Sequence, residues 1–423
     1  MKKIIAILLT IVSMLTLPAC QSGGQESSAP TMKAATDEGV KELPVVTVLV
    51  DLCKSDLTTT AVSDLLNSAP GYGEEFMIAT ETLPDFWTSD EQRQAALTQL
   101  KTEILAGKGP DVFLCENPIM ENGNVGGAVF EFPRQAMDSH LLPPLDQYIE
   151  GSERLEWDRL TPRIMEAGKN GEGQHILPLT FGFDVMCFNK ENFTLEAELP
   201  MTSDEMLESS DPMVRYTGMF RMGVRSVFGQ IEDYERDELL VPEEEIAARI
   251  EQFSGLDEEF PQFQLSDPIN QRSILGNYAM GGTAKTGFGG GDYWLVPRYN
   301  VEGGITATVG AFAAINRNTK LPGKSFKVLE TLLTSTGQTS ELLKQLNGQP
   351  VHMGVPCAVW TNTEGNQEQF SALLEQINAA VFRTPVEQEF DRLTRDVNAA
   401  EGGDIEDIVH EHYMKMQMML AES

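Results

Sequence analysis

The chain has 423 residues, of which 64 are acidic and 31 are basic, so its formal net charge at pH 7 is −33. A chain this acidic repels phosphate backbones, which excludes nucleic acid as a partner and disfavours an anionic solute; the simpler role of the acidity is to keep an exported protein soluble. Five cysteines in so long a chain exclude a small disulfide scaffold.

The N-terminus has the pattern of an export signal. Two lysines precede an apolar run over residues 4–17 that is too short to span a bilayer comfortably. The run ends in Leu17-Pro18-Ala19-Cys20, which resembles the lipobox of bacterial lipoproteins. The resemblance implies that residues 1–19 are a signal peptide and that a lipid on Cys20 anchors the exported chain to the outer face of the cell membrane. An ordinary cleaved signal that ends near a cysteine is the alternative.

Composition then divides the remaining chain. Residues 20–43 begin with a segment that is poor in bulky apolar side chains, which predicts a flexible tether behind the lipidated cysteine. About 380 residues follow Leu43 without a second long apolar run, and this is more than one hydrophobic core usually serves. Two lobes are therefore expected.

The first part of the folded region alternates strands and helices. We predict a buried strand at Val45–Asp51, a polar loop at 52–57, a helix at 58–67, a strand at 76–80, a helix at 89–107 that begins with a Ser89/Gln92 capping pattern, and a strand from Val112. This alternation is typical of a parallel sheet with helices on both faces, whose ligands bind at the carboxyl ends of the strands.

Three spaced segments resemble the carbohydrate-type extracellular solute-binding proteins (family 1) of ABC importers. They are Ala106-Gly107 with Pro110-Asp111-Val112; Gly173–Leu179 followed by Met186–Phe193; and Ala314–Asn316 followed by a helix at Ser325–Leu333 that ends in Thr336-Gly337-Gln338. With an amphipathic C-terminal helix at Ile405–Leu420, the resemblance extends over essentially the whole exported chain.

The resemblance implies an α/β, two-lobe periplasmic-binding-protein-like fold (type II), with a mostly parallel sheet and flanking helices in each lobe and a cleft between the lobes. Chain crossings are expected near residues 178–185, 304–310 and 360, so residues 44–180 plus 308–360 would form the N-terminal lobe and 181–307 plus 361–423 the C-terminal lobe. The implied function is capture of a solute, a sugar or oligosaccharide, for delivery to ABC permease subunits by a monomer without catalysis or cofactor.

Candidate ligand-binding residues are the polar and aromatic side chains at strand ends and lobe crossings. They are Asp51, Lys54 and Asp56 after the first strand; Glu116 and Asn117 after the third; Phe181, Phe183 and Asp184 at the first crossing; Phe288, Tyr293 and Trp294 in and after a glycine-rich segment; and Phe382 and Arg383, where the family presents a stacking residue. The alternative for the loop residues is ordinary surface polarity, and for the aromatics it is core packing or, at Tyr293 and Trp294, the start of a strand.

The segments that resemble enzyme or metal-binding motifs depart from them at key positions. Residues 318–325 differ from a phosphate-binding loop because Asn318 replaces the first glycine and Pro322 stiffens the turn. His410 and His412 are two residues apart on a helix, so they diverge and do not chelate a metal together. Carboxylate pairs are abundant, so a secreted lipoprotein glycoside hydrolase is one alternative function. A surface or sensor lipoprotein that works without a permease is another. Cys53, Cys115, Cys187 and Cys357 are expected as buried thiols, with one long-range disulfide as the alternative.

Overall fold

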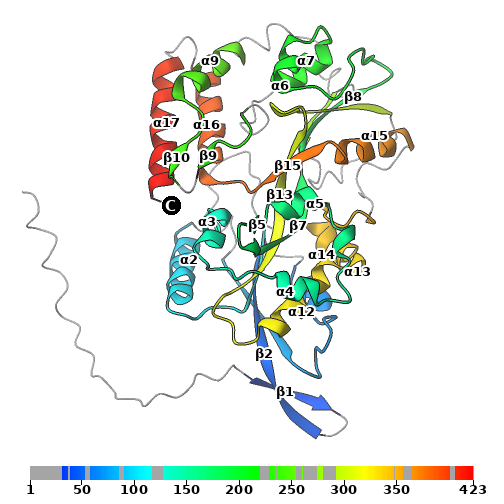
Figure 1. Ribbon diagram of the computed structural model, residues 1–423, viewed down its shortest axis with the longest axis vertical. Helices are drawn as coiled ribbons and strands as arrows, with labels where there is room; N and C mark the ends of the chain where they lie inside the picture. The colour runs from blue at the N-terminus through cyan, green and yellow to red at the C-terminus, as the bar shows by residue number, and fades with distance from the viewer. Residues whose placement is uncertain are drawn as a thin grey trace, which may run out of the picture.

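The computed structural model describes residues 31–36, 39–52, 58–84, 90–116, 127–219, 228–233, 236–253, 260, 274–279, 292–346, 348–355, 364–400 and 405–422. These residues form two lobes stacked along the longest axis of the molecule, here named the lower and the upper lobe as they lie in Figure 1. Within them, no helix combines the length and the apolar character needed to cross a membrane.

The lower lobe is built on a mixed sheet with the strand order β1-β2-β4-β13-β7-β14, to which β3 adds beside β2 and β15 beside β13. Its elements in chain order are β1 (Thr31–Thr36), β2 (Gly39–Asp51), α1 (Thr58–Leu66), β3 (Met77–Thr82), α2 (Asp90–Leu105), β4 (Val112–Glu116), α3 (Pro133–Asp138), α4 (Asp146–Glu150), η1 (Trp157–Arg159), α5 (Pro162–Glu166), β5 (Lys169–Asn170), β6 (Gly173–Gln174), β7 (Ile176–Gly182), β13 (Ile305–Ile315), α12 (Pro322–Leu333), α13 (Ser335–Gln338), α14 (Glu341–Gln345) and β14 (Gln349–Pro350).

The upper lobe carries a three-stranded sheet, β11-β8-β12, and most of the remaining helices (Figure 1). Its elements are β8 (Asp184–Asn189), α6 (Ser203–Glu208), α7 (Pro212–Met219), β9 (Glu232–Asp233), β10 (Glu238–Leu239), α9 (Glu243–Phe253), β11 (Ile274–Ala279), β12 (Tyr293–Pro297), α15 (Glu364–Leu374), α16 (Pro385–Ala399) and α17 (Ile405–Ala421). Between α15 and α16 the chain forms β15 (Ile377–Val381), which pairs with β13 of the lower sheet. The acidic, methionine-rich region after Pro200 supplies α6, α7 and α9, whose buried side chains include Met206 and Met213.

The two-lobe α/β class predicted from the sequence is confirmed, but the strands are less often parallel than expected. Parallel pairing holds for β2 with β3 and β4, the region of strand–helix alternation. In contrast, β13 is antiparallel to β4 and β7, and the described sheet of the upper lobe is antiparallel throughout. The reason is topological, because the chain leaves the lower lobe along β7 and returns along β13, so these neighbouring strands run in opposite directions.

The N-terminal elements begin earlier than the sequence suggested. β1 and β2 form an antiparallel hairpin in which Thr31 pairs with Pro44 and Thr36 with Gly39. This hairpin occupies residues that were expected to belong to a flexible tether. The segment is poor in bulky apolar residues, but a strand ladder is formed by backbone groups once a partner strand lies beside it.

The predicted helices and strands of the lower lobe agree with the structure to within a few residues. β2 is buried almost completely from Val45 to Val50 because β3 and β4 flank it on either side. The helix predicted to stop at Gly107 is α2, which ends at Leu105, and Gly107 has a φ of +79°, a left-handed conformation that favours glycine.

Two of the segments that carry the family resemblance, residues 106–112 and 314–316 with the turn that follows, form hydrogen-bonded clamps at the amino end of β4. The Asp111 carboxylate accepts hydrogen bonds from the Thr47 amide at 2.8 Å and from the Thr319 hydroxyl at 2.5 Å. The Asn316 side chain donates to the Pro110 carbonyl at 2.8 Å, and the Asn318 side chain to the Ile104 carbonyl at 2.7 Å. The segment that imitates a phosphate-binding loop is therefore a structural turn leading into α12.

Candidate functional site

The carboxyl ends of β2 and β4 meet at the edge of the lower sheet that faces the upper lobe. Asp51, the last residue of β2, pairs with Cys115, and Glu116 follows at the end of β4. Asp51 is 3% exposed, and its two carboxylate oxygens accept hydrogen bonds of 2.9 and 2.8 Å from the Arg93 guanidinium, which is also buried. At this edge of the sheet, the buried negative charge of Asp51 is thus neutralised by the buried positive charge of Arg93.

Arg93 also fixes the loops on either side of the ion pair. Its guanidinium donates to the carbonyl of Pro84, after β3, and to the carbonyl of Gly127, which follows β4. Burial raises the pKa of the Asp51 carboxyl, and the hydrogen bonds and charge of Arg93 oppose this rise without cancelling it. The nearby Cys115 thiol has a pKa raised by burial and, to a smaller degree, by the Asp51 charge.

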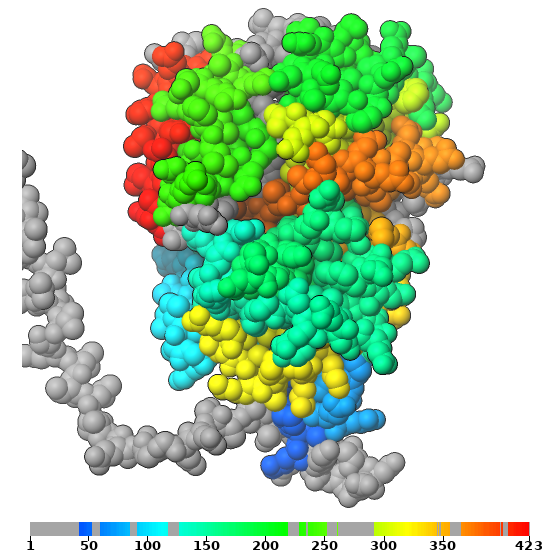
Figure 2. Space-filling model, in the orientation of Figure 1, coloured from blue at the N-terminus to red at the C-terminus, as the bar shows by residue number. Residues whose placement is uncertain are grey.

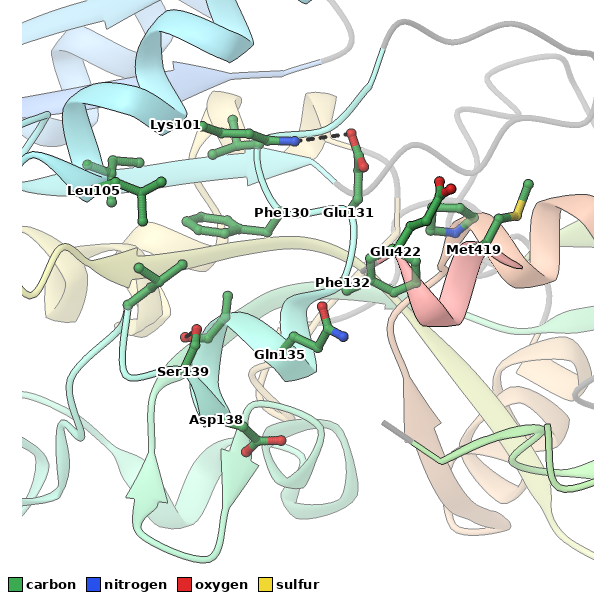
Figure 3. Close-up of a pocket in the computed structure, with 15 residues that line it drawn as sticks. Lys101, Leu105, Phe130, Glu131, Phe132, Gln135, Asp138, Ser139, Met419 and Glu422 are labelled. Carbon is green, nitrogen blue, oxygen red and sulfur yellow. Dashed lines mark hydrogen bonds and ion pairs between the residues drawn. The ribbon is translucent and has the colours of Figure 1, made fainter. Parts of the chain in front are cut away.

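A pocket of about 730 Å³ opens between the two lobes, next to the segment that Arg93 holds (Figure 3). The lower lobe contributes one end of α2, the stretch before α3, and α3 itself; the upper lobe contributes the start of α16 and the end of α17. The lining residues are Lys101, Ile104, Leu105, Val129, Phe130, Glu131, Phe132, Gln135, Ala136, Asp138, Ser139, Leu141, Pro385, Met419 and Glu422.

The pocket lining combines apolar surface with a few hydrogen-bonding groups. Phe130 and Phe132 provide aromatic carbon, while Gln135 and Ser139 provide neutral donors and acceptors (Figure 3). The charged side chains of the lining are mostly acidic, and Lys101 is paired with Glu131 at 3.3 Å. The volume of the pocket lies within the range of about 300–1,000 Å³ usual for small-molecule sites. Such a lining suits a neutral, hydroxyl-rich molecule better than an anion.

A chain of aromatic rings connects the pocket wall to the sheet and to the upper lobe. Phe130 lies edge-on to Phe113 with ring centroids 5.0 Å apart, and Phe312 of β13 lies 6.3 Å from Phe130. Phe312 in turn makes a T-shaped contact at 5.4 Å with Phe382, just before α16. Because these rings pack in series across the boundary, a change in the angle between the lobes must alter their packing.

The candidate residues of the first crossing lie in packed positions outside the pocket lining. Phe181 is 1% exposed on β7, and Phe183 is stacked on Phe370 of α15 with centroids 6.2 Å apart. Asp184 begins β8 and forms an ion pair with Arg298 at 3.2 Å. The structure therefore gives these three residues positions in the junction between the sheets, and contact with a ligand stays a prediction for them.

Tyr293 and Trp294 lie on β12 rather than in a loop. Tyr293 is buried, and the indole N–H of the half-buried Trp294 donates to the Phe193 carbonyl at 3.0 Å. The Lys190 ammonium lies 4.8 Å from the centre of the Trp294 ring. This arrangement matches the alternative in which the two aromatics start a strand.

Phe382 and Arg383 are near the pocket but are not among its lining residues. Phe382 is 8% exposed and packs behind the wall through Phe312, and Arg383 forms an ion pair with Asp391 of α16. Pro385, two residues further on, does line the pocket. Contact of Phe382 or Arg383 with a ligand therefore stays a prediction.

Several predicted residues lie outside the described ranges: Lys54, Asp56, Asn117, Phe288, the lipidation site Cys20, and two of the four later cysteines, Cys53 and Cys357. Cys115 and Cys187 are free and buried, as expected. Among the described residues, no group of three or more histidine, cysteine, aspartate or glutamate side chains is placed to hold a metal ion.

The residues that line the pocket were not singled out in the sequence. The clearest missed signal is the run Val129-Phe130-Glu131-Phe132-Pro133, which presents two aromatic residues between a glycine pair and a helix-starting proline soon after a strand end.

No family model matches the sequence, and no curated protein matches it. Solved structures match over almost their whole length. They include an extracellular solute-binding protein family 1 from Alicyclobacillus acidocaldarius (TM-score 0.58, 13% identity, 89% of this chain and 98% of that one), a periplasmic oligogalacturonide binding protein from Yersinia enterocolitica (0.58, 12%, 89% and 99%), and the sugar-binding protein MalE from Xanthomonas citri (0.56, 15%, 89% and 98%).

The chain has the fold of the extracellular solute-binding proteins. In this solute-binding fold, the two lobes meet at β7, at β13 and at the loops that follow the strand ends. The pocket lined by Phe130, Phe132 and Gln135 opens at the same boundary. Fold and pocket therefore place the candidate site of this chain between its lobes.

Proposed function

We propose that the protein is the substrate-binding lipoprotein of an ABC transporter and that it captures a saccharide in the pocket between its lobes. The observation that carries the proposal is the lining of that pocket, which offers Phe130 and Phe132 to the apolar faces of a sugar ring and Gln135 and Ser139 to its hydroxyls. The names of several structures with this fold include an oligogalacturonide, a cyclic maltosyl-maltose and tagatose as ligands. These names support a saccharide as the ligand class.

Binding would bring the two walls of the pocket together. Lower-lobe residues and residues of α16 and α17 line the same space, so a ligand that touches both walls favours the closed arrangement. The closed protein would then deliver the solute to permease subunits at the membrane, where a lipid on Cys20 keeps it. In this proposal the protein binds without catalysis.

A thermal-unfolding screen against monosaccharides, oligosaccharides, peptides and polyamines tests the ligand class. A saccharide at one hundred times its Kd should stabilise the protein by about 2.7 kcal/mol. If a peptide or polyamine stabilises the protein and no saccharide does, the saccharide assignment is wrong. Release of reducing ends from a stabilising oligosaccharide by the purified protein would instead identify a hydrolase.

Lipid attachment needs its own experiment because the signal and Cys20 lie outside the described residues. In cells fed labelled palmitate, the wild-type protein should take up label and Cys20→Ser should not. Equal labelling of the two proteins would rule out Cys20 as the anchor. Labelling is independent of the ligand screen, so either half of the proposal can fail alone.

A further inference from the structure

The outer face of α17 carries a stripe of one histidine and two methionines. His410, Met414 and Met418 are spaced by four residues, which places them on one side of the helix in successive turns. Met414 and Met418 are 44% and 58% exposed, and His410 is also exposed. In Figure 2, α17 is the red column along one edge of the molecule, with a face open to solvent.

Packing does not account for these methionines. α17 is anchored by a different face, formed by Val409, His412, Met416 and Leu420, which are all buried. Exposed leucine or lysine would serve a solvent-facing helix equally well, but only methionine adds a thioether. Thioether sulfur is a soft ligand that selects Cu(I) and similar ions.

The histidine of the stripe is oriented as metal-binding histidines are. Its Nδ1 lies 3.0 Å from a carboxylate oxygen of Glu243 in α9, which fixes the ring and directs Nε2 to be the atom that binds a metal. Glu243 also lines a hollow of about 810 Å³ between α9 and α17, together with Glu244, Glu251 and Glu406. This negative hollow raises the local concentration of cations beside the stripe.

We propose that His410, Met414 and Met418 form a surface site for one soft monovalent cation, Cu(I) or Ag(I). Neighbouring donors lie one helical turn apart, with Cβ atoms about 5–6 Å from each other, and such ions accept the two-coordinate geometry that a pair of side chains can supply. Met414 belongs to both possible pairs, so the stripe holds one ion at a time. The site lies apart from the pocket between the lobes and involves no redox step.

The test uses Ag(I) as the probe in chloride-free buffer with the full chain. Cys20, Cys53 and Cys357 are replaced by serine, so that their thiols do not compete for the ion. In protein with ¹³C-labelled methionine methyl groups, titration should shift the Met414 and Met418 signals and saturate at one ion per chain. His410→Gln and Met418→Leu each leave one pair intact, so the association constants of these two variants should add up to that of the parent, whereas Met414→Leu should abolish binding.

Met353→Leu is the matched control, because Met353 is equally exposed, at 56%, but lies far from α17 in the chain. That variant should bind Ag(I) like the parent. The proposal is overturned if the Met414 and Met418 signals stay in place while other methionines shift, or if Met414→Leu binds as the parent does. Unchanged melting temperatures across the variants would establish that lost binding is not unfolding.

Discussion

The two ends of β4 are built from different kinds of interaction. At the amino end, Asp111, Asn316 and Asn318 hold turns through neutral and charge-assisted hydrogen bonds to backbone groups. At the carboxyl end, a buried ion pair between Asp51 and Arg93 fixes the loops beside the pocket. Two of the three segments that resemble the solute-binding family lie at the first end, and Asn318 there also bonds the carbonyl of Ile104 in the pocket wall. These two segments therefore hold the lobe together, and none of Asp111, Asn316 and Asn318 is among the residues that line the pocket.

The largest expected effect comes from breaking the buried ion pair. Arg93→Met leaves Asp51 buried without its partner, which should lower the free energy of unfolding by about 3–5 kcal/mol. The double variant Asp51→Leu/Arg93→Met removes both charges and should recover most of that loss. Urea denaturation of the two proteins measures the difference. A double variant as unstable as the single one would show that Arg93 stabilises mainly through the loops it holds.

The clamp at the amino end should be the next most costly to break. Asp111→Ala removes the acceptor for Thr47 and Thr319, at an expected cost of about 2–3 kcal/mol in the free energy of unfolding. Saccharide affinity, measured by calorimetry, should be unchanged because neither Asp111 nor its partners Thr47 and Thr319 line the pocket. A tenfold loss of affinity in this variant would contradict this and show that Asp111 also supports the pocket wall.

Changes in the pocket lining should lower ligand affinity with little effect on stability. Gln135→Ala removes a hydrogen-bonding group from the lining and should weaken saccharide binding about tenfold, equivalent to about 1.4 kcal/mol, while the free energy of unfolding changes by less than about 1 kcal/mol. Thr98→Ala on the exposed face of α2 is the control, since its hydroxyl donates only to Gln94 of the same helix. Equal affinity for the Gln135 and Thr98 variants would place the ligand elsewhere.

The smallest effect concerns pH. Burial raises the pKa of Asp51 above its ordinary value, so the folded state binds a proton at this carboxyl more readily than the unfolded state. The contribution of this group is therefore most favourable below its ordinary pKa and is lost as pH rises through the folded value. Removing Arg93 raises the pKa of Asp51 in the folded state further. The loss in the free energy of unfolding caused by Arg93→Met should therefore be about 1 kcal/mol smaller at pH 5 than at pH 7. A larger loss in the free energy of unfolding at pH 5 than at pH 7 would contradict this expectation.

The sequence predicted the elements whose burial follows a simple period. Val45–Asp51 and Val112 onward were recognisable as buried strands, and α2 ended where glycine allows a left-handed turn. The antiparallel course of β13 was not predictable from local pattern, because it depends on the chain returning from the other lobe. Strand β1 was missed because its sequence, Thr31–Thr36, has few bulky apolar residues and lacks the apolar alternation typical of a strand.

The site was harder to predict than the fold. Polarity after a strand pointed to Asp51, but only the structure revealed that Arg93, 42 residues later, occupies its carboxylate. The pocket residues come from helices and a short aromatic stretch that carry no motif, and they meet residues of α16 and α17 nearly 300 positions further along the chain. Such a juxtaposition has no local signature in a single sequence.

The shared strand β13 has a consequence for how the protein unfolds. Its first residues pair with β15, and its later residues pair with β7 and β4, so one stretch of backbone belongs to the hydrogen-bond ladders of both regions. Because β15 connects α15 with α16 of the upper lobe, the upper lobe cannot unfold completely without fraying the ladder that supports the lower one. The lobes should therefore melt in one cooperative transition, with the amides of β13 among the last in the molecule to exchange with solvent.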